Sequence, residues 1–353
     1  MSDPGTPLQL GDLVDLASER VGGQVLAAND EFFAEKENLL KAKKPIFLEH
    51  EYTDRGKWMD GWETRRAFGR IPDHELDWCI VKLGLPGAIA GVDVDTAFFR
   101  GNYPEACSID ALHLPGNPDV ATLLAATWRP LLPKTPLQGN SSNLLSIATP
   151  DGSGRVPGAP VTHLRLNIFP DGGVARLRVY GSVVPDWTAI RRFGDVVDLA
   201  AVEAGGAVLA CNDMFFGSRH NLIMPGRSVN MGDGWETKRK RVPGHDWSIV
   251  GLGARAGRVR VIEVDTNHFK GNCPESVAID GVDEPGATIA SLTDAARAWR
   301  EVLPRTTLRP HTRHFFDAEL KDRANLSHLR VRIFPDGGIS RLRVHAELAE
   351  KGP

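Results

Sequence analysis

The chain carries two carboxylates, three residues apart, in a pentapeptide that occurs twice. Asp60-Gly61-Trp62-Glu63-Thr64 returns unchanged as Asp233 to Thr237, and two basic residues follow each copy. A carboxylate beside fixed cations can stay ionised, orient a substrate amide or act as a general base. A capped loop with a solvated ion pair would leave the same pattern. The candidate acid–base residues are Asp60, Glu63, Asp233 and Glu236, with Arg65 beside the first pair.

A second polar group follows a stretch of alternating apolar and polar residues that predicts a half-buried strand. Loops at the ends of strands commonly carry ligand-binding groups. The competing interpretation is an Asx turn, in which the side chains satisfy only local backbone groups. The candidate binding residues of this group are Asp95, Asn102 and Glu105, repeated as Asp265, Asn272 and Glu275.

A third polar group is a histidine two residues before an arginine. His163 and Arg165 occur in one predicted strand, and His328 and Arg330 repeat them. Residues two apart on a strand share a face, so that the two side chains point together. Such a pair can bind a carboxylate and donate a proton, although a purely structural histidine fits the pattern too.

These groups recur because the chain is a tandem duplication. The order of the matches is the same throughout, and the offset between copies shrinks from 183 at Asn29/Asn212 to 165 at Ile168/Ile333. Repeated apolar residues such as Phe33 and Trp62 need no role beyond packing. We expect a tail over 1–10, a first repeat over 11–183, a linker over 184–193, a second repeat over 194–347 and a tail over 348–353.

Each repeat is predicted to consist mainly of short strands. Alternation on both sides of a Pro-Asp-Gly-Gly turn predicts a β-hairpin over 161–180, repeated over 329–344. Apolar residues at helical spacing predict one helix per repeat, over 119–132 and 287–303. Several strands, glycine- and proline-rich turns and a single helix are typical of an all-β jelly-roll sandwich.

The composition and charge of the chain argue against some classes of function. A net charge of −3 argues against a nucleic-acid partner, and no apolar run is long enough to span a membrane. The four cysteines lie far apart and the start of the chain lacks the features of a signal peptide, so we expect a soluble cytoplasmic protein. The residues alone favour a small-molecule enzyme and a sugar-like binding module about equally.

Longer stretches of the sequence resemble the allantoicase family. The most specific is Asp54 to Arg66, and Leu13 to Arg20, Ala28 to Phe33 and Phe99 to Glu105 also fit. The likeness is collinear over nearly the whole chain and includes the duplication. The second copy lacks the Asp54-Arg55-Gly56-Lys57-Trp58 run, so the two copies are not equivalent if that run takes part in the reaction.

The resemblance implies a hydrolase that converts allantoate and water to (S)-ureidoglycolate and urea. It further implies two jelly-roll domains related to galactose-binding-like modules, in a homo-oligomer. Asp60 and Glu63 would then be acid and base, and Arg65 or Arg165 would bind the substrate carboxylate. The ureido groups would be bound by Asp95, Asn102 and Glu105, with His163 nearby. No ligand motif requires a cofactor, although such a carboxylate-rich site could hold Mn²⁺. The alternative is a non-catalytic tandem jelly roll that binds a small, sugar-like molecule.

Overall fold

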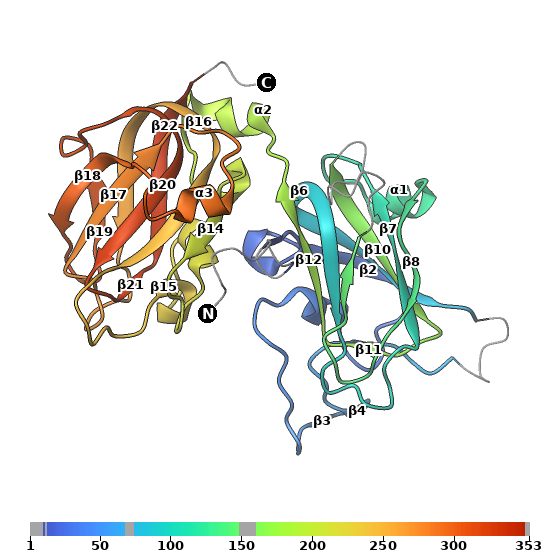
Figure 1. The fold of residues 1–353 in the computed structure, drawn as a ribbon. Helices are drawn as coiled ribbons and strands as arrows, with labels where there is room; N and C mark the ends of the chain where they lie inside the picture. Colours follow the sequence, from blue (N-terminus) through green and yellow to red (C-terminus); the bar gives the residue numbers. More distant parts are fainter. Residues whose placement is uncertain (1–9, 11–12, 68–73, 148–159, 350–353) are drawn as a thin grey trace. The chain divides into compact units, whose positions relative to one another are not determined.

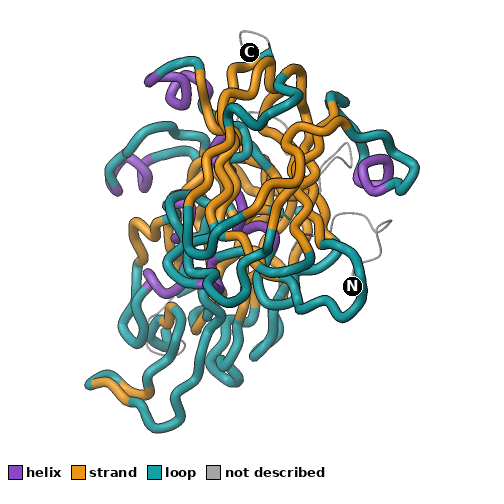
Figure 2. The backbone as a smooth tube through the Cα atoms, turned by 90° about the vertical axis from the view of Figure 1, so that its left-hand side faces the viewer, coloured by secondary structure: helices purple, strands orange, loops and turns teal. Residues whose placement is uncertain are grey.

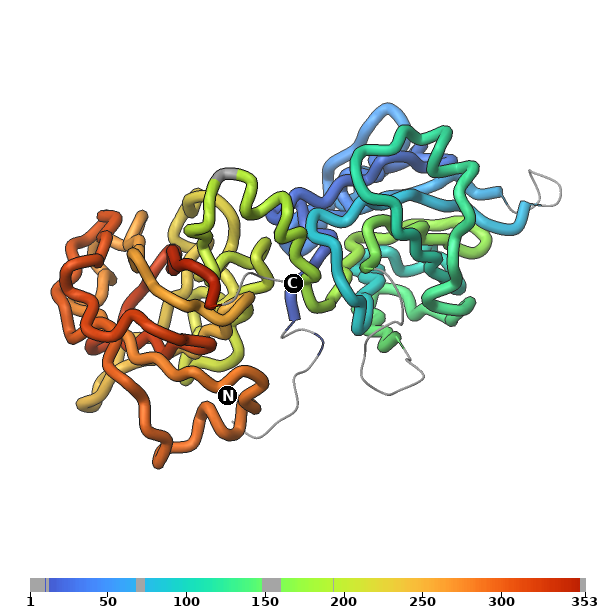
Figure 3. Tube along the Cα trace, turned by 90° about the horizontal axis from the view of Figure 1, so that it is seen from above, coloured from blue at the N-terminus to red at the C-terminus, as the bar shows by residue number. Residues whose placement is uncertain are grey.

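The computed structural model describes residues 10, 13–67, 74–147 and 160–349. The chain divides into two compact units between Val184 and Pro185 (Figure 3). The boundary lies in the segment that we expected to be a linker, which forms α2 (Trp187–Ile190) and a 3-10 turn over Arg191–Phe193. Strands make up the body of each unit, and the short helices lie in the connections (Figure 2).

The first repeat is a two-layered sandwich built around one long strand, β6 (Asp77–Asp95). Its first part pairs with β2 and β10, and its last part pairs with β12 and β9. β6 therefore runs through both layers (Figure 1). One layer contains β2 (Gln24–Ala28), β10 (Val161–Phe169), β7 (Ala106–Leu112) and β8 (Arg129–Pro136), and the other contains β1 (Val14–Asp15), β12 (Arg176–Val183) and β9 (Leu144–Ser146).

The second repeat has the same strand order around β16 (Asp246–Asp265). One layer contains β14 (Ala207–Cys211), β20 (Ala324–Phe334), β17 (Ser276–Val282) and β18 (Arg300–Thr307), and the other contains β13 (Val196–Asp198), β22 (Arg341–Leu348) and β19 (Arg313–Phe316). The predicted all-β tandem jelly roll is confirmed. Among the described residues, no helix has the length and apolar character needed to cross a membrane.

Alternating apolar side chains fill the space between the layers. Leu164, Leu166 and Ile168 of β10 are fully buried, as are Val92 and Val94 of β6. Successive residues of a strand point to opposite faces, so one face of each strand supplies the core while the other carries polar groups. Arg165 of β10, a polar candidate, consequently lies on the outer face of the sandwich, whereas His163 of the same strand is fully buried.

Short elements occupy the connections. The first repeat has 3-10 turns over Glu19–Val21 and Lys36–Leu40, the hairpin β3 (Tyr52–Thr53) and β4 (Gly56–Lys57), and the pair β5 (Trp62–Glu63) and β11 (Gly173–Val174). The second repeat has 3-10 turns over Val202–Ala204, Arg219–Ile223 and Met231–Asp233, and the pair β15 (Trp235–Glu236) and β21 (Gly338–Ile339). The pairs β5–β11 and β15–β21 match, whereas the second repeat has no named strands matching β3 and β4 among the residues described.

The predicted helices are shorter than expected. The stretch 119–132 forms only α1 (Val120–Ala125), which Asp119 caps by accepting a hydrogen bond from the Thr122 N–H at 2.8 Å, before the chain enters β8. Pro130 lies two residues into β8 and favours extended backbone at the residue before it. The stretch 287–303 likewise forms α3 (Ile289–Thr293) and then β18. The later part of each stretch pairs with a neighbouring strand, β7 in the first repeat and β17 in the second. This pairing outweighs the helical spacing of the apolar residues, so these parts form strands.

The predicted hairpins are wrong as well. β10 and β12 do not pair with each other, because β6 lies between them; β20 and β22 are separated in the same way by β16. The Pro-Asp-Gly-Gly segment instead connects the two layers, with Gly172 at φ +143°. There Gly173 pairs with Glu63 and donates its N–H to the Asn102 carbonyl at 2.8 Å. The segment thus joins the Glu63 and Asn102 loops.

Candidate active site in the first repeat

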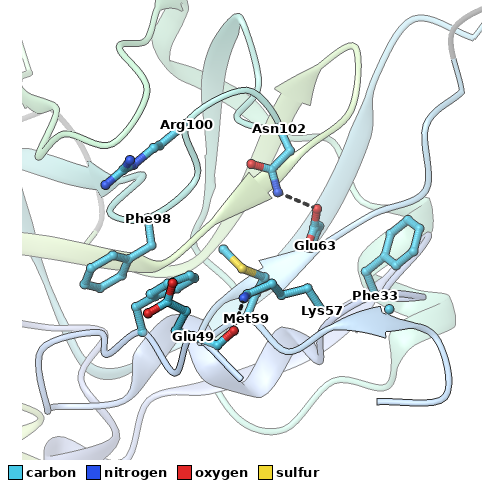
Figure 4. Close-up of a pocket in the computed structure, with 10 residues that line it drawn as sticks. Phe33, Glu49, Lys57, Met59, Glu63, Phe98, Arg100 and Asn102 are labelled. Atoms are coloured by element: carbon cyan, nitrogen blue, oxygen red, sulfur yellow. Dashed lines mark hydrogen bonds between the residues drawn. The ribbon is translucent and has the colours of Figure 1, made fainter. Parts of the chain in front are cut away.

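A cavity of about 610 Å³ opens among the loops at one end of the first repeat (Figure 4). Two of the predicted residues, Glu63 and Asn102, line it. The other lining residues are Phe33, Phe47, Glu49, Gly56, Lys57, Met59, Phe98 and Arg100. Phe33, which we expected only to pack, therefore belongs to the site.

Glu63 is the predicted acid–base residue that the structure places in the cavity. Its backbone is held on both sides, by β11 and by a hydrogen bond from its N–H to the Ala34 carbonyl at 3.1 Å. The Asn102 Nδ2 donates to Glu63 Oε1 at 2.8 Å. Burial raises the pKa of Glu63, while the Asn102 hydrogen bond and the charge of Arg66 counteract part of that rise. A fixed carboxyl with a raised pKa is suited to donating and accepting a proton.

The opposite wall of the cavity is the segment 47–59, which includes the β3–β4 hairpin. Lys57 donates from Nζ to the Glu49 carbonyl, and its ammonium lies 4.8 Å from the centre of the Phe47 ring and 5.1 Å from that of Tyr52. The Phe47 ring stacks on Phe98 at 5.6 Å between centroids. These contacts hold a cation at the cavity wall, next to the rings of Phe47 and Tyr52.

Arg100 supplies a second cation. It follows Phe98, which has φ +69°, and the fully buried Phe99. Its side chain is exposed and has no ion-pair partner among the described residues. Lys57 and Arg100 were not predicted from the sequence. A signal existed for both: Lys57 belongs to the run that the second copy lacks, and Lys270 keeps the charge of Arg100 in the second copy.

Asp60, the other predicted acid–base residue of this repeat, does not line the cavity. Its Oδ2 accepts hydrogen bonds from Arg176 Nη2 at 2.7 Å and from the Ile46 N–H at 3.0 Å. Burial by itself would raise its pKa, but these two hydrogen bonds and the charges of Arg176 and Lys41 leave the pKa of Asp60 below its usual value. The other oxygen, Oδ1, lies 3.7 Å from Lys41 Nζ and accepts no hydrogen bond from the described residues. A buried carboxylate that is ionised and paired with Arg176 is a poor proton donor, so the geometry favours a structural role for Asp60.

The predicted carboxylate binders Arg65 and Arg165 are also engaged elsewhere. Arg65 is 61% exposed and pairs with Asp30, with its Nε 3.1 Å from Oδ1. Arg165 donates from Nε and Nη2 to Asp110 Oδ2, at 3.2 and 2.9 Å, on the outer face of β10. Neither lines the cavity.

His163, Asp95 and Glu105 lie outside the cavity too. His163 is fully buried with its Nδ1 3.0 Å from Thr162 Oγ1, and burial together with Lys82 lowers its pKa to about 4. Asp95 accepts a hydrogen bond from the Ala97 N–H at 2.8 Å, which is the Asx turn of the competing interpretation. Glu105 is exposed, and its backbone pairs with Phe169 and Leu137.

The second repeat has a counterpart of the Glu63–Asn102 pair but no counterpart of the long segment 47–59 that forms the cavity wall. Asn272 donates from Nδ2 to Glu236 Oε1, as Asn102 does to Glu63. Phe216, the counterpart of Phe33, is 62% exposed. The Val229 N–H donates to Asp233 Oδ2 at 3.1 Å, as the Ile46 N–H does to Asp60. Only residues 230–232 separate those two groups, against residues 47–59 in the first repeat.

The remaining predicted residues of the second repeat have local partners. Asp265 accepts from the Asn267 N–H at 2.9 Å and pairs with Arg227. The other pairs are Glu275 with Arg305, Arg330 with Asp280, and His328 with the hydroxyl of Ser327. These contacts leave Glu236 and Asn272 as the only predicted residues of this repeat that match the lining of the first-repeat cavity.

The described side chains offer few donor atoms for a metal ion. Within the described parts of the chain, no three His, Cys, Asp or Glu side chains come together so that they could hold an ion. The cavity itself presents two carboxylates, Glu49 and Glu63, and no histidine or cysteine among its lining residues. This donor set does not fit a Mn²⁺ site, which is built from several oxygen or nitrogen ligands.

Known proteins resemble the chain over nearly its whole length. Residues 14–184 and 197–349 match a family model described as an allantoicase repeat. A probable allantoicase of Burkholderia mallei (strain ATCC 23344) is 46% identical over 349 residues, covering 99% of this chain and 98% of that protein. An allantoicase of Dictyostelium discoideum is 47% identical, covering 99% and 90%. A crystal structure of allantoicase from Saccharomyces cerevisiae has a TM-score of 0.77 at 36% identity, covering 94% and 92%.

Proposed function

The chain belongs to the allantoicase family and hydrolyses allantoate to (S)-ureidoglycolate and urea, and we propose that the reaction takes place in the cavity of the first repeat. One observation is the main support for placing the reaction in this cavity. The half-buried Glu63, fixed by Asn102, faces a cavity to which Lys57 and Arg100 also contribute. An acid–base group and two cations in one cavity are what the substrate requires.

Allantoate carries one carboxylate and two ureido groups on a single CH carbon. The carboxylate is negatively charged, and a guanidinium and an ammonium are the side chains that bind it most strongly. Lys57 and Arg100 take that role in place of Arg65 and Arg165. The ureido N–H groups are donors, for which the oxygens of Glu49 and Asn102 are acceptors.

The reaction breaks the bond between the central carbon and one ureido nitrogen. Protonated Glu63 donates its proton to that nitrogen, which keeps the electron pair of the bond and leaves in urea. The nitrogen of the remaining ureido group shares its lone pair with the central carbon, and an acyliminium-like centre forms. Water then adds to this carbon and gives one proton to the Glu63 carboxylate. Urea and ureidoglycolate are released, and Glu63 is protonated again.

Glu63 is the residue whose replacement tests this location. Glu63→Gln keeps the shape and the Asn102 contact but cannot exchange a proton, and we expect urea release from allantoate to fall by about 10²–10⁴-fold. Glu236→Gln in the second repeat is the matched control, with activity close to that of the unmodified protein. Normal turnover of Glu63→Gln would place the reaction elsewhere.

We further propose that hydrolysis needs no bound divalent metal. The support is the donor set, since Glu49 and Glu63 are the only carboxylates among the described residues that line the cavity. Urea release should survive dialysis against EDTA and should not rise on addition of Mn²⁺. Loss of activity with EDTA and recovery with Mn²⁺ would contradict the proposal and make these carboxylates metal ligands.

We propose, finally, that the protein acts in the cytoplasm as a homo-oligomer. Four cysteines without a disulfide among them suit a reducing compartment. Phe215, Phe216 and Val229 of the second repeat are large apolar side chains that stay more than 60% exposed, and exposed apolar groups of this kind often mark a subunit interface. Light scattering on the purified protein would decide the number of subunits, and a monomeric mass would refute the oligomer.

A further inference from the structure

The buried pair of Arg176 and Asp60 lies behind the cavity wall and has no place in the mechanism above. Arg176 is 1% exposed, and all three nitrogens of its guanidinium donate hydrogen bonds within the first repeat. We propose that this pair is a positioning device: it fixes both ends of the segment 47–59 and thereby places Lys57 in the cavity. The proposal rests on the assignment of the reaction to the first-repeat cavity.

The contacts of the pair reach both ends of the segment. At the upstream end, Arg176 Nε donates to the Lys43 carbonyl at 3.0 Å, and the Ile46 N–H donates to Asp60 Oδ2 at 3.0 Å. At the downstream end, Arg176 Nη1 donates to the Asp60 carbonyl at 2.9 Å, and Nη2 donates to Asp60 Oδ2 at 2.7 Å. One guanidinium and one carboxylate thus hold the chain where it leaves the body of the repeat and where it returns.

Between these ends the segment has few other anchors, of which buried Met59, packed with Phe99 and Ala175, lies next to the downstream end. Residues 48–55 are all exposed. Beyond the hairpin pairing, the contacts that tie the segment to the rest of the repeat include the Phe47–Phe98 stack and a hydrogen bond from Arg55 Nη1 to the Phe32 carbonyl at 3.1 Å. A loop with fixed ends samples fewer conformations than one with free ends, so pinning both ends preorganises its side chains. Five of the ten lining residues belong to this segment: Phe47, Glu49, Gly56, Lys57 and Met59.

Arg176 and Asp60 cannot act on the substrate directly. Neither lines the cavity, and both are buried. Arg176 makes a further hydrogen bond to the Ala175 carbonyl at 2.7 Å, in addition to those at the ends of the segment. A contribution of the pair to the reaction must therefore pass through the segment that it holds.

The second repeat contains the same pair without the wall. Arg341 donates from Nε to the Gly226 carbonyl at 3.2 Å, from Nη1 to the Asp233 carbonyl and from Nη2 to Asp233 Oδ2 at 3.0 Å. Only residues 230–232 lie between the pinned ends. The Arg341–Asp233 pair is thus an internal control, because it has the same structural contacts and no cavity wall to position.

The test compares Arg176→Lys with Arg341→Lys in the full-length protein. Lysine keeps the positive charge beside the aspartate, so that the fold is retained, but a single ammonium cannot reach both ends of the segment as the guanidinium does. We expect both variants to lose a similar amount of thermal stability. We expect only Arg176→Lys to raise the KM for allantoate, by at least about tenfold, because small misplacements of binding groups are costly. The kcat and its pH profile, which depend on Glu63, should change much less.

Asp60→Asn is the second variant, which keeps the oxygen that accepts from Ile46 and Arg176 but removes the charge. It should raise the KM in the same direction and by a smaller factor. Equal KM values for Arg176→Lys and Arg341→Lys, with equal losses of thermal stability, would show a purely structural pair and overturn the inference.

Glu63→Gln, measured in the same series, separates this inference from the location of the reaction. If Glu63→Gln is active, the cavity is not the active site and the location fails. If Glu63→Gln is inactive while Arg176→Lys binds allantoate normally, only the positioning role fails.

Discussion

The two repeats share a fold, a polar pair and a buried ion pair, and the largest difference in length between them lies in one connection. Glu63 with Asn102 and Arg176 with Asp60 have close counterparts in Glu236 with Asn272 and Arg341 with Asp233. The connection between the pinned ends has thirteen residues in the first repeat and three in the second. The groups present in both repeats therefore form a common scaffold, and the proposed site depends on the longer connection that only the first repeat has.

The repeated features alone would place the site in both copies. Repetition preserves whatever both copies need, and much of that is structural: the Arg–Asp pair, the Asx turn at Asp95 and Asp265, and the outer-face pairs of Arg165 and Arg330. The cations of the cavity follow a different rule. Lys57 belongs to the first copy only, and Arg100 is matched by a shorter side chain, Lys270. In this molecule, identity between the copies indicates the Glu63–Asn102 pair, and the difference between the copies indicates the cavity wall.

The largest expected effect comes from making the first repeat like the second. Replacing residues 47–59 by Asn-Met-Gly, the sequence of 230–232, removes Lys57 and half of the cavity lining while Arg176 and Asp60 keep their contacts. We expect a folded protein whose urea release is lower by at least about 10³-fold, since binding and orientation are both lost. Circular dichroism and thermal unfolding would verify the fold. Substantial activity in this variant would show that the wall is not part of the site.

The second effect concerns the loss of stability at low pH, to which His163 of the first repeat and His328 of the second should contribute differently. Burial, with a smaller contribution from Lys82, lowers the pKa of His163 to about 4, so the folded chain binds this proton only well below the pH at which the unfolded chain does. Stability from this group is present above pH 6.5 and is lost as the pH falls towards 4, by up to about 3 kcal/mol. Urea unfolding at pH 7 and pH 4.5 measures it, and His163→Phe should weaken the dependence.

The corresponding change in the second repeat should have a smaller effect. Burial and Arg297 lower the pKa of His328 as well, but the charge of Glu284 opposes them. His328→Phe should therefore remove less of the pH dependence than His163→Phe. Equal effects of the two substitutions would contradict the difference in their surroundings.

The third effect compares Arg100 with Lys270, its counterpart in the second repeat. Arg100→Gln removes a charge from the cavity and should raise the KM for allantoate by about 10–100-fold, the usual range for a hydrogen bond to a charged group. Lys270→Gln makes the same change in the second repeat and should leave the KM as it is. Steady-state kinetics of the two variants suffices, and an equal rise in both would mean that the second repeat also binds substrate.

The smallest effect concerns the pH profile. Mechanistically, Glu63 must be protonated at the start of the cycle, so activity falls as the pH rises through its raised pKa. The Asn102 hydrogen bond favours the ionised form of Glu63, so Asn102→Ala should move this alkaline limb to higher pH. Asn272→Ala should leave the limb unmoved. A shift of the limb to lower pH in Asn102→Ala would contradict the role of this hydrogen bond.

The sequence was a good guide to architecture and a partial guide to the site. Alternation, glycine turns and duplication are local or periodic signals, and they predicted an all-β tandem jelly roll. The same local signals failed at 119–132, where apolar residues at helical spacing form α1 and then β8. They failed again at 161–180, because two alternating stretches joined by a turn look like a hairpin whether or not a third strand comes between them.

By itself, the sequence determined the family and the duplication and singled out Glu63 and Asn102 as candidates, since each of these follows from residue types and their order. Only the tertiary structure showed which of the two carboxylates of the pentapeptide lines the cavity. Asp60 and Glu63 are three residues apart and chemically alike, yet Arg176, 116 residues further along, binds one and leaves the other facing the cavity. The meeting of Arg100 with Lys57 and Glu63 likewise depends on the packing of two separate connections, one before β6 and one after it, and no local sequence pattern shows that they meet.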